Sequence, residues 1–438
     1  MAKYLIQNCD LADLDTLTAR RCDILIEGSV IRRIAPAQPV PPDAETVDAR
    51  GMLALPGFVD CHTHLYQTFL KGPLDDYPIT AWLLELIRHE QRMDDEARYY
   101  SSLLGCLSSL RFGTTTVNEM GTDETIDTTL QAMADCGIRA TFGTSPTDIA
   151  ENELTPVRPM EEILKTSEEV CAKIAGMPGG RVRAAMAPAG LPACTGELMK
   201  TLKAFADERG LIFHTHLAEG RDQTAGVAAR FGLGGEAEAL ASLGVLDSHT
   251  VLAHCIWLRD SELALIRDSG AVPVHCPNTN MKICDGIPRI HRMLQLGIPV
   301  AMGCDGEASS STRDMIREGR AGSYLQKVTT MDPTAMAAGT TFKMMTVNGA
   351  RALGLADVGE LREGFKADLI LVDTAHELSL ANPDYRIGNL LYAGDGHAVD
   401  TVFCDGQLLV RGGHLTRFDE ERVIARCGEI IHKMDRGF

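Results

Sequence analysis

Short apolar runs alternate with helix-length amphipathic stretches through the middle of the chain, and this alternation restricts the fold more than any other feature. The apolar runs are residues 114–117, 140–142, 182–187, 211–216, 251–254, 272–275 and 299–302. The amphipathic stretches between them include residues 125–136, 160–174, 197–208 and 261–268. Alternating strands and helices predict an α/β fold with a parallel sheet, and about eight such units predict a closed (β/α)8 barrel. A doubly wound sheet is the alternative, but no G-x-G-x-x-G pattern follows any of these runs.

Both ends of the chain instead carry short β-type runs bounded by turn residues. The N-terminal runs are residues 23–27, 30–34, 46–47 and 52–55, and the C-terminal runs are residues 367–372, 399–404 and 407–410. The dipeptide Asp405-Gly406 between the last two runs is typical of a tight hairpin. We therefore expect residues 1–55 and 363–438, the latter with a terminal helix, to form one small β-domain. Residues 56–362 would form the barrel.

The composition excludes several classes of partner. Among 438 residues there are 42 Lys and Arg against 60 Asp and Glu, a net charge of −18, which argues against binding to a phosphate backbone. The hydrophobic fraction of 45% is large enough to build a sizeable core. We expect a small-molecule substrate and no nucleic-acid partner.

The sequence also lacks the features of an exported or membrane-bound chain. The N-terminus has no apolar region of a secretory signal, and the apolar stretch nearest to it, residues 52–59, is too short to span a bilayer. The 13 Cys residues are odd in number and form no C-x-x-C pair, which favours free thiols in a reducing compartment. We expect a cytoplasmic protein that does not bind membranes, and a homo-oligomer, since soluble oligomers are mostly homo-oligomers.

Two histidines directly follow the first apolar run of the barrel region. In Asp60-Cys61-His62-Thr63-His64 the two imidazoles are two positions apart. Residues at i and i+2 share one face of a strand, so both imidazoles can point into the barrel mouth and bind one metal ion. An isolated H-x-H can equally be two incidental loop histidines.

Further polar residues end other strands of the predicted barrel. They are His214 and His216 after residues 211–213, His254 after 251–253, and Asp305 after 299–302. Each alone is weak, because a single His is often a hydrogen-bonded core residue and an Asp before Gly is usually a turn former. Active sites of barrels lie at the carboxyl ends of the strands. Together these residues supply two or three imidazoles and one carboxylate, a ligand set for a divalent metal with an open position for water.

The motifs resemble the amidohydrolase superfamily, and within it the branch of heterocycle deaminases and triazine hydrolases, over nearly the whole chain. The matching segments are residues 55–60 (LPGFVD), the H-x-H, the H-x-x-E of His216 and Glu219, residues 253–255 (AHC), residues 275–282 (HCPNTNMK), Asp305-Gly306 and residues 364–369 (GFKADL). The resemblance implies a distorted TIM barrel beside a β-sandwich built from both termini. It also implies one divalent metal ion, commonly zinc and sometimes iron.

The same resemblance assigns roles to individual residues. His62, His64, His216 and Asp305 would be the metal ligands, and His214 would lie behind them or in the core. Residues 182–187 end without the lysine of two-metal members, which favours a single metal.

Three of the strand-end residues would act on the substrate. A bound divalent metal lowers the pKa of its water, so hydroxide is available at neutral pH. Asp305 would accept the proton of that water, neutral Glu219 would protonate a ring nitrogen, and His254 would orient the water and stabilise the developing oxygen.

The expected reaction is hydrolytic deamination of an aminated nitrogen heterocycle by metal-bound hydroxide, with release of ammonia. One alternative is hydrolytic dechlorination or dealkylamination of an s-triazine by the same residues. Another, of a different class, is a catalytically silent binding scaffold of the same fold, which the intact ligand set argues against.

The substrate pocket is less defined by the sequence. Residues 75–83 resemble the pocket loop of this branch, so Gln67, Trp82 and Glu90 are candidate substrate contacts, although Trp82 also fits a core position on an amphipathic helix. Glu307 could face the pocket, but a surface position is favoured.

Two departures from the branch bear on the substrate. Its nucleoside deaminases carry a His in a G-P-H-S-P-like stretch, where residues 187–192 (APAGLP) have none. They also carry an Arg for a substrate carboxylate after the third strand, where residues 143–145 have none and Arg158 lies farther on. A purine base, a pterin or an s-triazine is therefore expected rather than a nucleoside with an amino-acid tail.

Overall fold

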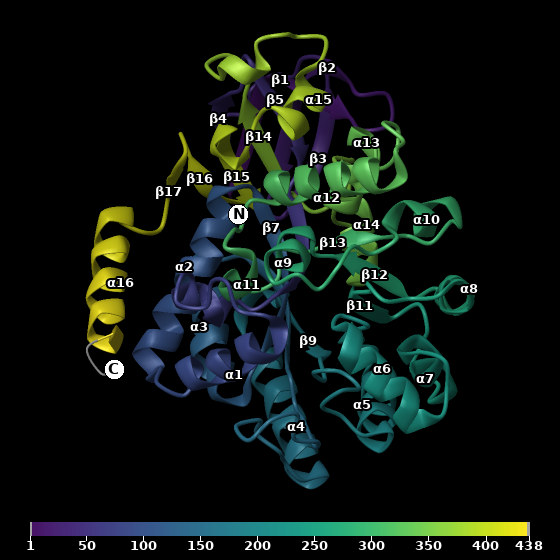
Figure 1. Cartoon of the computed structure of the whole chain (residues 1–438). Helices are drawn as coiled ribbons and strands as arrows, with labels where there is room; N and C mark the ends of the chain where they lie inside the picture. The colour runs from purple at the N-terminus through teal and green to yellow at the C-terminus, as the bar shows by residue number, and fades with distance from the viewer. Residues whose placement is uncertain (1, 436–438) are drawn as a thin grey trace.

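The computed structural model describes residues 2–435, and its centre is a ring of eight parallel strands (Figure 1). In order around the ring they are β6 (Phe58–Thr63), β7 (Thr114–Gly121), β8 (Arg139–Thr144), β9 (Val182–Met186), β10 (Ile212–Leu217), β11 (Thr250–His254), β12 (Val272–His275) and β13 (Ala301–Met302). The Asp305 N–H donates to the His62 carbonyl at 2.8 Å and so joins the end of the last strand to the first. The chain thus forms the predicted distorted TIM barrel.

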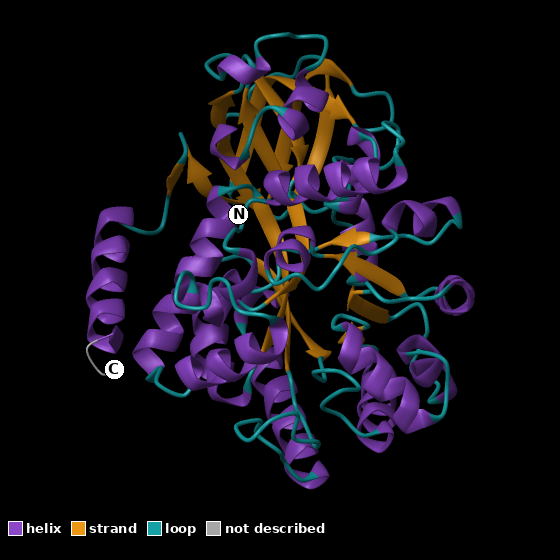
Figure 2. Ribbon diagram, in the orientation of Figure 1, coloured by secondary structure: helices purple, strands orange, loops and turns teal. Residues whose placement is uncertain are grey.

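Helices surround this ring on the outside (Figure 2). They are α1 (Ile79–Glu90), α2 (Asp95–Arg111), α3 (Ile126–Cys136), α4 (Met160–Ala175), α5 (Gly196–Arg209), α6 (Arg221–Phe231), α7 (Glu236–Ser242), α8 (Asp260–Ser269), α9 (Pro277–Lys282), α10 (Ile290–Gln295), α11 (Glu307–Ser310), α12 (Met315–Thr330), α13 (Ala338–Met344) and α14 (Val347–Ala352). Short 3-10 turns are η1 (Leu65–Leu70), η2 (Asp123–Thr125) and η3 (Pro178–Gly180).

Local chemistry sets the ends of these helices. At α5, for example, the Thr195 hydroxyl accepts from the Leu198 N–H at 3.2 Å, and Gly210 ends the helix with a φ of 64°. The strands inside are largely covered on both faces, and every residue of β7 and β12 is buried. Within residues 2–435, none of the helices has both the length and the apolar character needed to span a bilayer.

A second sheet contains strands from both ends of the chain. Its members are β1 (Lys3–Asp13), β2 (Thr18–Glu27), β3 (Val30–Ala35), β4 (Glu45–Asp48), β5 (Met52–Pro56), β14 (Leu369–Asp373), β15 (Val399–Cys404), β16 (Gln407–Arg411) and β17 (His414–Leu415). The two ends meet where β5 and β14 pair antiparallel from Met52↔Asp373 to Pro56↔Leu369. The sequence pattern did not predict β1, whose alternation is interrupted by a bulge at Asn8, a residue with a φ of 62°.

The remaining elements hold the two parts together. They are η4 (Leu378–Leu380), α15 (Arg386–Tyr392), η5 (Gly396–Ala398) and α16 (Glu420–Asp435). The terminal helix α16 lies beside α2 in Figure 1 and packs Cys427 and Ile430 into an apolar cluster with Trp82. At the start of β8, the buried Arg139 donates to Asp368 of the terminal part at 2.6 and 3.0 Å and to Asp405 at 3.0 Å. These contacts fix the terminal sheet against the barrel.

Candidate active site

The carboxyl ends of the barrel strands bring the expected metal ligands together. Ligand nitrogens of His62, His64 and His216 lie within 4.8 Å of one another. Asp305 completes the group, because its Oδ1 lies 3.3 Å from His62 Nε2 and 3.4 Å from His64 Nε2. We call these four residues the metal cluster. His62 lies on β6 and His64 directly follows it, His216 lies on β10, and Asp305 lies on the loop after β13. These segments are far apart in the sequence, but their carboxyl ends face the same barrel mouth.

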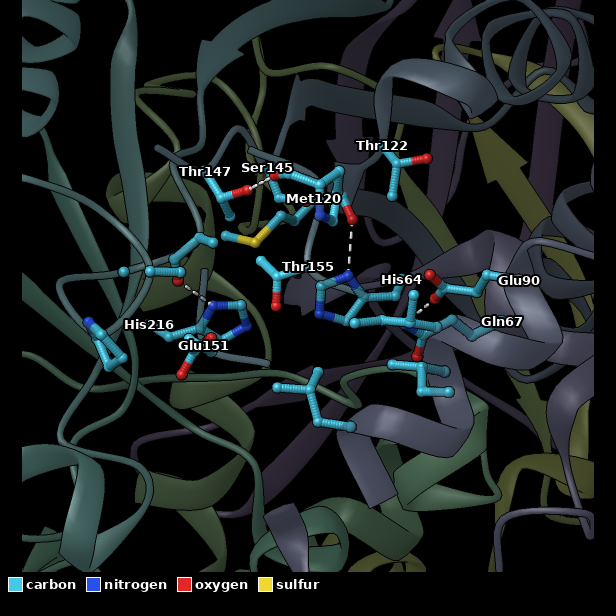
Figure 3. A pocket seen from close by; sticks show the side chains of 18 of the residues that line it. His64, Gln67, Glu90, Met120, Thr122, Ser145, Thr147, Glu151, Thr155 and His216 are labelled. Atoms are coloured by element: carbon cyan, nitrogen blue, oxygen red, sulfur yellow. Dashed lines mark hydrogen bonds between the residues drawn. The ribbon is translucent and has the colours of Figure 1, made fainter. Parts of the chain in front are cut away.

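Backbone carbonyls orient two of the imidazoles. His64 Nδ1 lies 2.6 Å from the Met120 carbonyl and His216 Nδ1 lies 2.5 Å from the Ala189 carbonyl, as the dashed lines in Figure 3 show. A carbonyl can only accept, so Nδ1 carries the proton and Nε2 is left with its lone pair for a metal. Burial lowers the pKa of His64 to about 4 and that of His216 well below its usual range. Both rings are therefore neutral at neutral pH, as metal ligation requires.

A second buried imidazole orients His62. The His62 Nδ1 lies 3.1 Å from His214 Nε2, and His214 Nδ1 lies 3.0 Å from the Asn118 side-chain amide. The same amide reaches the Cys61 carbonyl at 2.8 Å. His214 therefore lies behind the metal cluster, one of the two positions expected for it. This hydrogen bond holds the His62 imidazole so that its Nε2 faces the other ligands.

Asp305 is held in a conformation that needs support from its surroundings. Its φ is 64°, in the left-handed region that non-glycine residues rarely adopt, and His254 has a φ of 70°. Such strain collects at functional sites, where neighbouring contacts hold it. The Gly306 N–H donates to Asp305 Oδ1 at 2.6 Å, and buried Arg313 donates to the Asp305 carbonyl at 2.9 Å. Burial raises the pKa of Asp305, but the electrostatic attraction of the neighbouring imidazoles, His62 first among them, outweighs burial, so the net pKa lies well below its usual range.

Glu219 and His254 form a second pair beside the metal cluster. Glu219 Oε1 lies 3.5 Å from His254 Nε2, and His254 Nδ1 lies 3.1 Å from the Asn280 side-chain oxygen. Burial, together with the negative charge of Asp305, raises the pKa of Glu219 to about 8. A carboxyl group with this pKa holds its proton at neutral pH and can donate it.

A large cavity of about 430 Å³ is lined by His64, His216, Glu219 and Asp305. This volume lies within the roughly 300–1,000 Å³ that is usual for small-molecule sites. All three expected substrate contacts line the cavity. The amide of Gln67 reaches Glu90 Oε1 at 3.3 Å, and burial raises the pKa of Glu90 to about 7. Trp82 lines the cavity and also packs in the apolar cluster under α16, so its role as a substrate contact stays a prediction.

Glu307 neither faces the pocket nor lies on the surface, so both positions considered for it from the sequence are wrong. Its side chain is only 3% exposed and is not part of the cavity wall. It pairs with Lys71 at 2.6 Å and with Arg313 at 3.4 Å, so two cations hold it inside the protein. Neither contact could be seen in the sequence, since Lys71 lies 236 residues away from Glu307.

The structure adds four polar residues that the sequence did not single out as site residues. Asn118 and Asn280 hold His214 and His254, as described above. Glu236 accepts from the Ala218 N–H at 3.0 Å, which fixes the turn before Glu219. Asp285 hydrogen-bonds to Glu219, and burial together with the charge of Glu219 raises the pKa of Asp285 to about 8. Of the four, only Asn280 lies in a matching segment, residues 275–282.

The metal cluster fits a divalent metal ion. The Nε2 atoms of His62 and His254 are buried and have no hydrogen-bond partner among the described residues. Unpaired polar atoms are costly in a protein interior, and an ion would satisfy those that face it. Three imidazoles with one carboxylate suit zinc or a similar borderline metal. His64, His216 and Asp305 also line the cavity, so one side of the site is open to a substrate.

Comparison with known proteins places the chain in a family. The model of the amidohydrolase family matches residues 53–409. The chain belongs to the amidohydrolase family, as its motifs predict, and is a hydrolase.

Its relatives share the length and the fold. The chain is 36% identical over 415 residues to a 5'-deoxyadenosine deaminase of Methanothermobacter thermautotrophicus, with 94% of each chain covered. It is also 36% identical over 425 residues to a 5-methylthioadenosine/S-adenosylhomocysteine deaminase of Carboxydothermus hydrogenoformans, covering 96% of this chain and 95% of the relative. An adenosine deaminase from Xanthomonas campestris with bound zinc superimposes with a TM-score of 0.92 at 25% identity, covering 99% of both chains. The relatives named here are deaminases, the reaction class that the sequence predicts.

Proposed function

We propose that the protein hydrolytically deaminates the adenine ring of a small nucleoside, using one zinc ion held by His62, His64, His216 and Asp305. The observation that carries the proposal is the half-buried Glu219, whose pKa of about 8 keeps it protonated beside the metal cluster. A ring nitrogen next to the amino-bearing carbon needs such a donor, whereas a simple amide has no ring nitrogen to protonate. The names of the three relatives support adenine-containing substrates.

The metal ion, when bound, would supply a water molecule that is ionised near neutral pH. The chain's own residues then move the protons. Asp305 takes the proton of the attacking water, and Glu219 gives its proton to the ring nitrogen as the ring carbon becomes tetrahedral. His254, 3.5 Å from Glu219, stabilises the developing oxygen. Return of the proton from Asp305 to the amino group releases ammonia. The proton of the new hydroxyl passes to Glu219, which leaves a ring carbonyl and restores the acid, so one water is consumed for each ammonia formed.

The cavity supports a substrate that is larger than a bare base. Its wall includes polar residues of the loops after β7 and β8, among them Thr122, Ser145 and Thr155 (Figure 3). The cavity volume of about 430 Å³ is also larger than a bare purine base fills. We therefore extend the expected substrate from a free base to a nucleoside, with Trp82, Gln67 and Glu90 as contacts on the α1 side. Residues 187–192 offer no imidazole for the sugar, so sugar contacts come from elsewhere in this chain.

The test is ammonia release from a panel of adenosine, 5'-deoxyadenosine, adenine, guanine and a chlorinated s-triazine. We expect ammonia from the adenine nucleosides with zinc-loaded protein and none after chelation. Chloride release from the triazine without ammonia from any amine would overturn the proposal in favour of dechlorination. Silence across the panel from protein that contains no metal would instead support a binding scaffold.

Other proposals concern the whole protein. We propose a cytoplasmic homo-oligomer that binds neither nucleic acid nor membranes. The net charge of −18 supports the absence of a nucleic-acid partner. We also propose that residues 1–55 and 363–438 form one unit and residues 56–362 another. Light scattering of the purified protein tests the oligomer, and limited proteolysis tests the boundaries.

A further inference from the structure

The cavity wall contains two cations, and both are already paired. Arg98 Nη1 lies 3.2 Å from Asp95 Oδ1. Arg158 pairs with Asp123 and also lies 3.8 Å from Glu162. Among the cavity-lining residues that the structure describes, these are the only Lys or Arg side chains. An anionic group of a substrate would therefore have to compete with existing carboxylate partners.

Two carboxylates of the same wall have no cationic partner within residues 2–435. Glu124 lies on η2, and Glu151 lies on the loop between β8 and α4. The amide of Gln223 donates to Glu151 Oε1 at 2.8 Å and so holds that side chain at the cavity wall. Figure 3 shows Glu151 on the side of the pocket where His216 lies. Glu151 is close enough to the reaction centre to add to the electrostatic raising of the Glu219 pKa.

We infer that this outer wall, made of Glu124, Glu151, Arg98 and Arg158, selects substrates by the charge of the tail attached to the heterocycle, with Glu151 as the specificity-determining residue. The inference rests on the proposed function. With the adenine ring at the metal cluster, a sugar substituent points toward the outer wall. A carboxylate there meets like charge from Glu151 in a partly desolvated cavity, whereas a neutral or cationic group does not. The wall therefore rejects anionic tails, a discrimination based on repulsion rather than on an added contact.

The experiment compares three nucleosides with the same base and sugar and different charge at the 5' position. They are 5'-deoxyadenosine, which is neutral, 5'-amino-5'-deoxyadenosine, which is cationic, and adenosine-5'-carboxylic acid, which is anionic. The kcat/KM for ammonia release is measured as a pH series from about pH 7 upward, because burial raises the pKa of Glu151 and the repulsion requires its ionised form. For the zinc-loaded wild-type protein, we expect the anionic nucleoside to be at least about tenfold poorer than the neutral one.

Variants assign the discrimination to Glu151. Glu151→Gln should raise the ratio of anionic to neutral kcat/KM by about fivefold, and Glu151→Lys should raise it further. Glu153→Gln is the matched control, because Glu153 is two residues away, 74% exposed and outside the cavity wall, and should leave the ratio unchanged.

Two different results would overturn the inference. The outer wall does not select by charge if wild-type protein deaminates the three nucleosides with kcat/KM values within about twofold. The same conclusion follows if the ratio of anionic to neutral kcat/KM is the same in Glu151→Gln as in the Glu153→Gln control. In both cases the proposed function survives. If zinc-loaded protein releases no ammonia from any of the three, the proposed function fails and this inference fails with it.

Discussion

Replacing Glu219 by Gln tests whether Glu219 is the proton donor of the reaction. The change removes the transferable proton and keeps the size of the side chain and its capacity for hydrogen bonding. Glu219 lines the cavity, lies 3.5 Å from His254 and is not one of the four ligands assigned to the metal. The variant should therefore keep its metal and lose its turnover.

The expected loss follows from the pKa of Glu219. At pH 7 a carboxyl group with a pKa of about 8 is about 90% protonated, whereas an ordinary Glu is well below 1% protonated. Burial thus makes nearly the whole population of Glu219 competent to donate. Loss of a general acid usually lowers kcat by about 10²–10⁴-fold, equivalent to about 3–5 kcal/mol of barrier.

The assay is ammonia release with 5'-deoxyadenosine, together with metal analysis of the same samples. Asp222→Asn, three residues away and exposed on α6, is the control and should keep wild-type kcat. The pH dependence has a defined sign. Because the acid form is required and its pKa is raised, kcat should fall as pH rises through about 8. Turnover of Glu219→Gln within a few-fold of wild type would refute the role as acid, and loss of metal from this variant would make Glu219 a ligand.

Three further predictions concern the metal, the water and the junction of the two sheets. His216→Ala should bind less than one tenth of the metal bound by wild type, as measured by elemental analysis, and full metal content would contradict the ligand assignment. His254→Asn should keep its metal and lower kcat by about 10²-fold or more, and an unchanged kcat would remove His254 from the mechanism. Arg139→Met should lower the free energy of unfolding by about 3–5 kcal/mol in urea titration, because it leaves buried Asp368 without its partner; a loss below about 1 kcal/mol would show that this pair does not hold the sheets together.

Much of the barrel and of the metal cluster could be predicted because strand ends are visible in the sequence. Apolar runs that end in His or Asp mark both the strand and the place where its polar side chain enters the barrel mouth. The run at residues 299–302 was only partly a strand, since β13 is limited to Ala301–Met302. Pro299 has no N–H for a ladder hydrogen bond, which limits how early the strand can begin.

The residues that support the ligands could not be predicted, because their partners are distant in the sequence. Asn118 reaches His214 across 96 residues, and Glu307 reaches Lys71 across 236. Burial of Glu307 depends on Arg313 and Lys71 approaching it from two sides, which no local pattern indicates. The ion pairs of the outer wall could not be predicted from the sequence either. Arg158 was visible as a candidate cation, but its pairing with Asp123 appears only in the fold.

The most direct test of the account is the stoichiometry of the reaction in oxygen-labelled water. Zinc-loaded protein is incubated with 5'-deoxyadenosine, ammonia is quantified, and the mass of the nucleoside product is measured by mass spectrometry. Protein whose metal has been removed with a chelator is treated in parallel. The account predicts one ammonia per product, one labelled oxygen on the purine ring, and neither in the chelated sample. Protein that contains zinc but forms no ammonia, or that forms product equally well after complete removal of the metal, would contradict it.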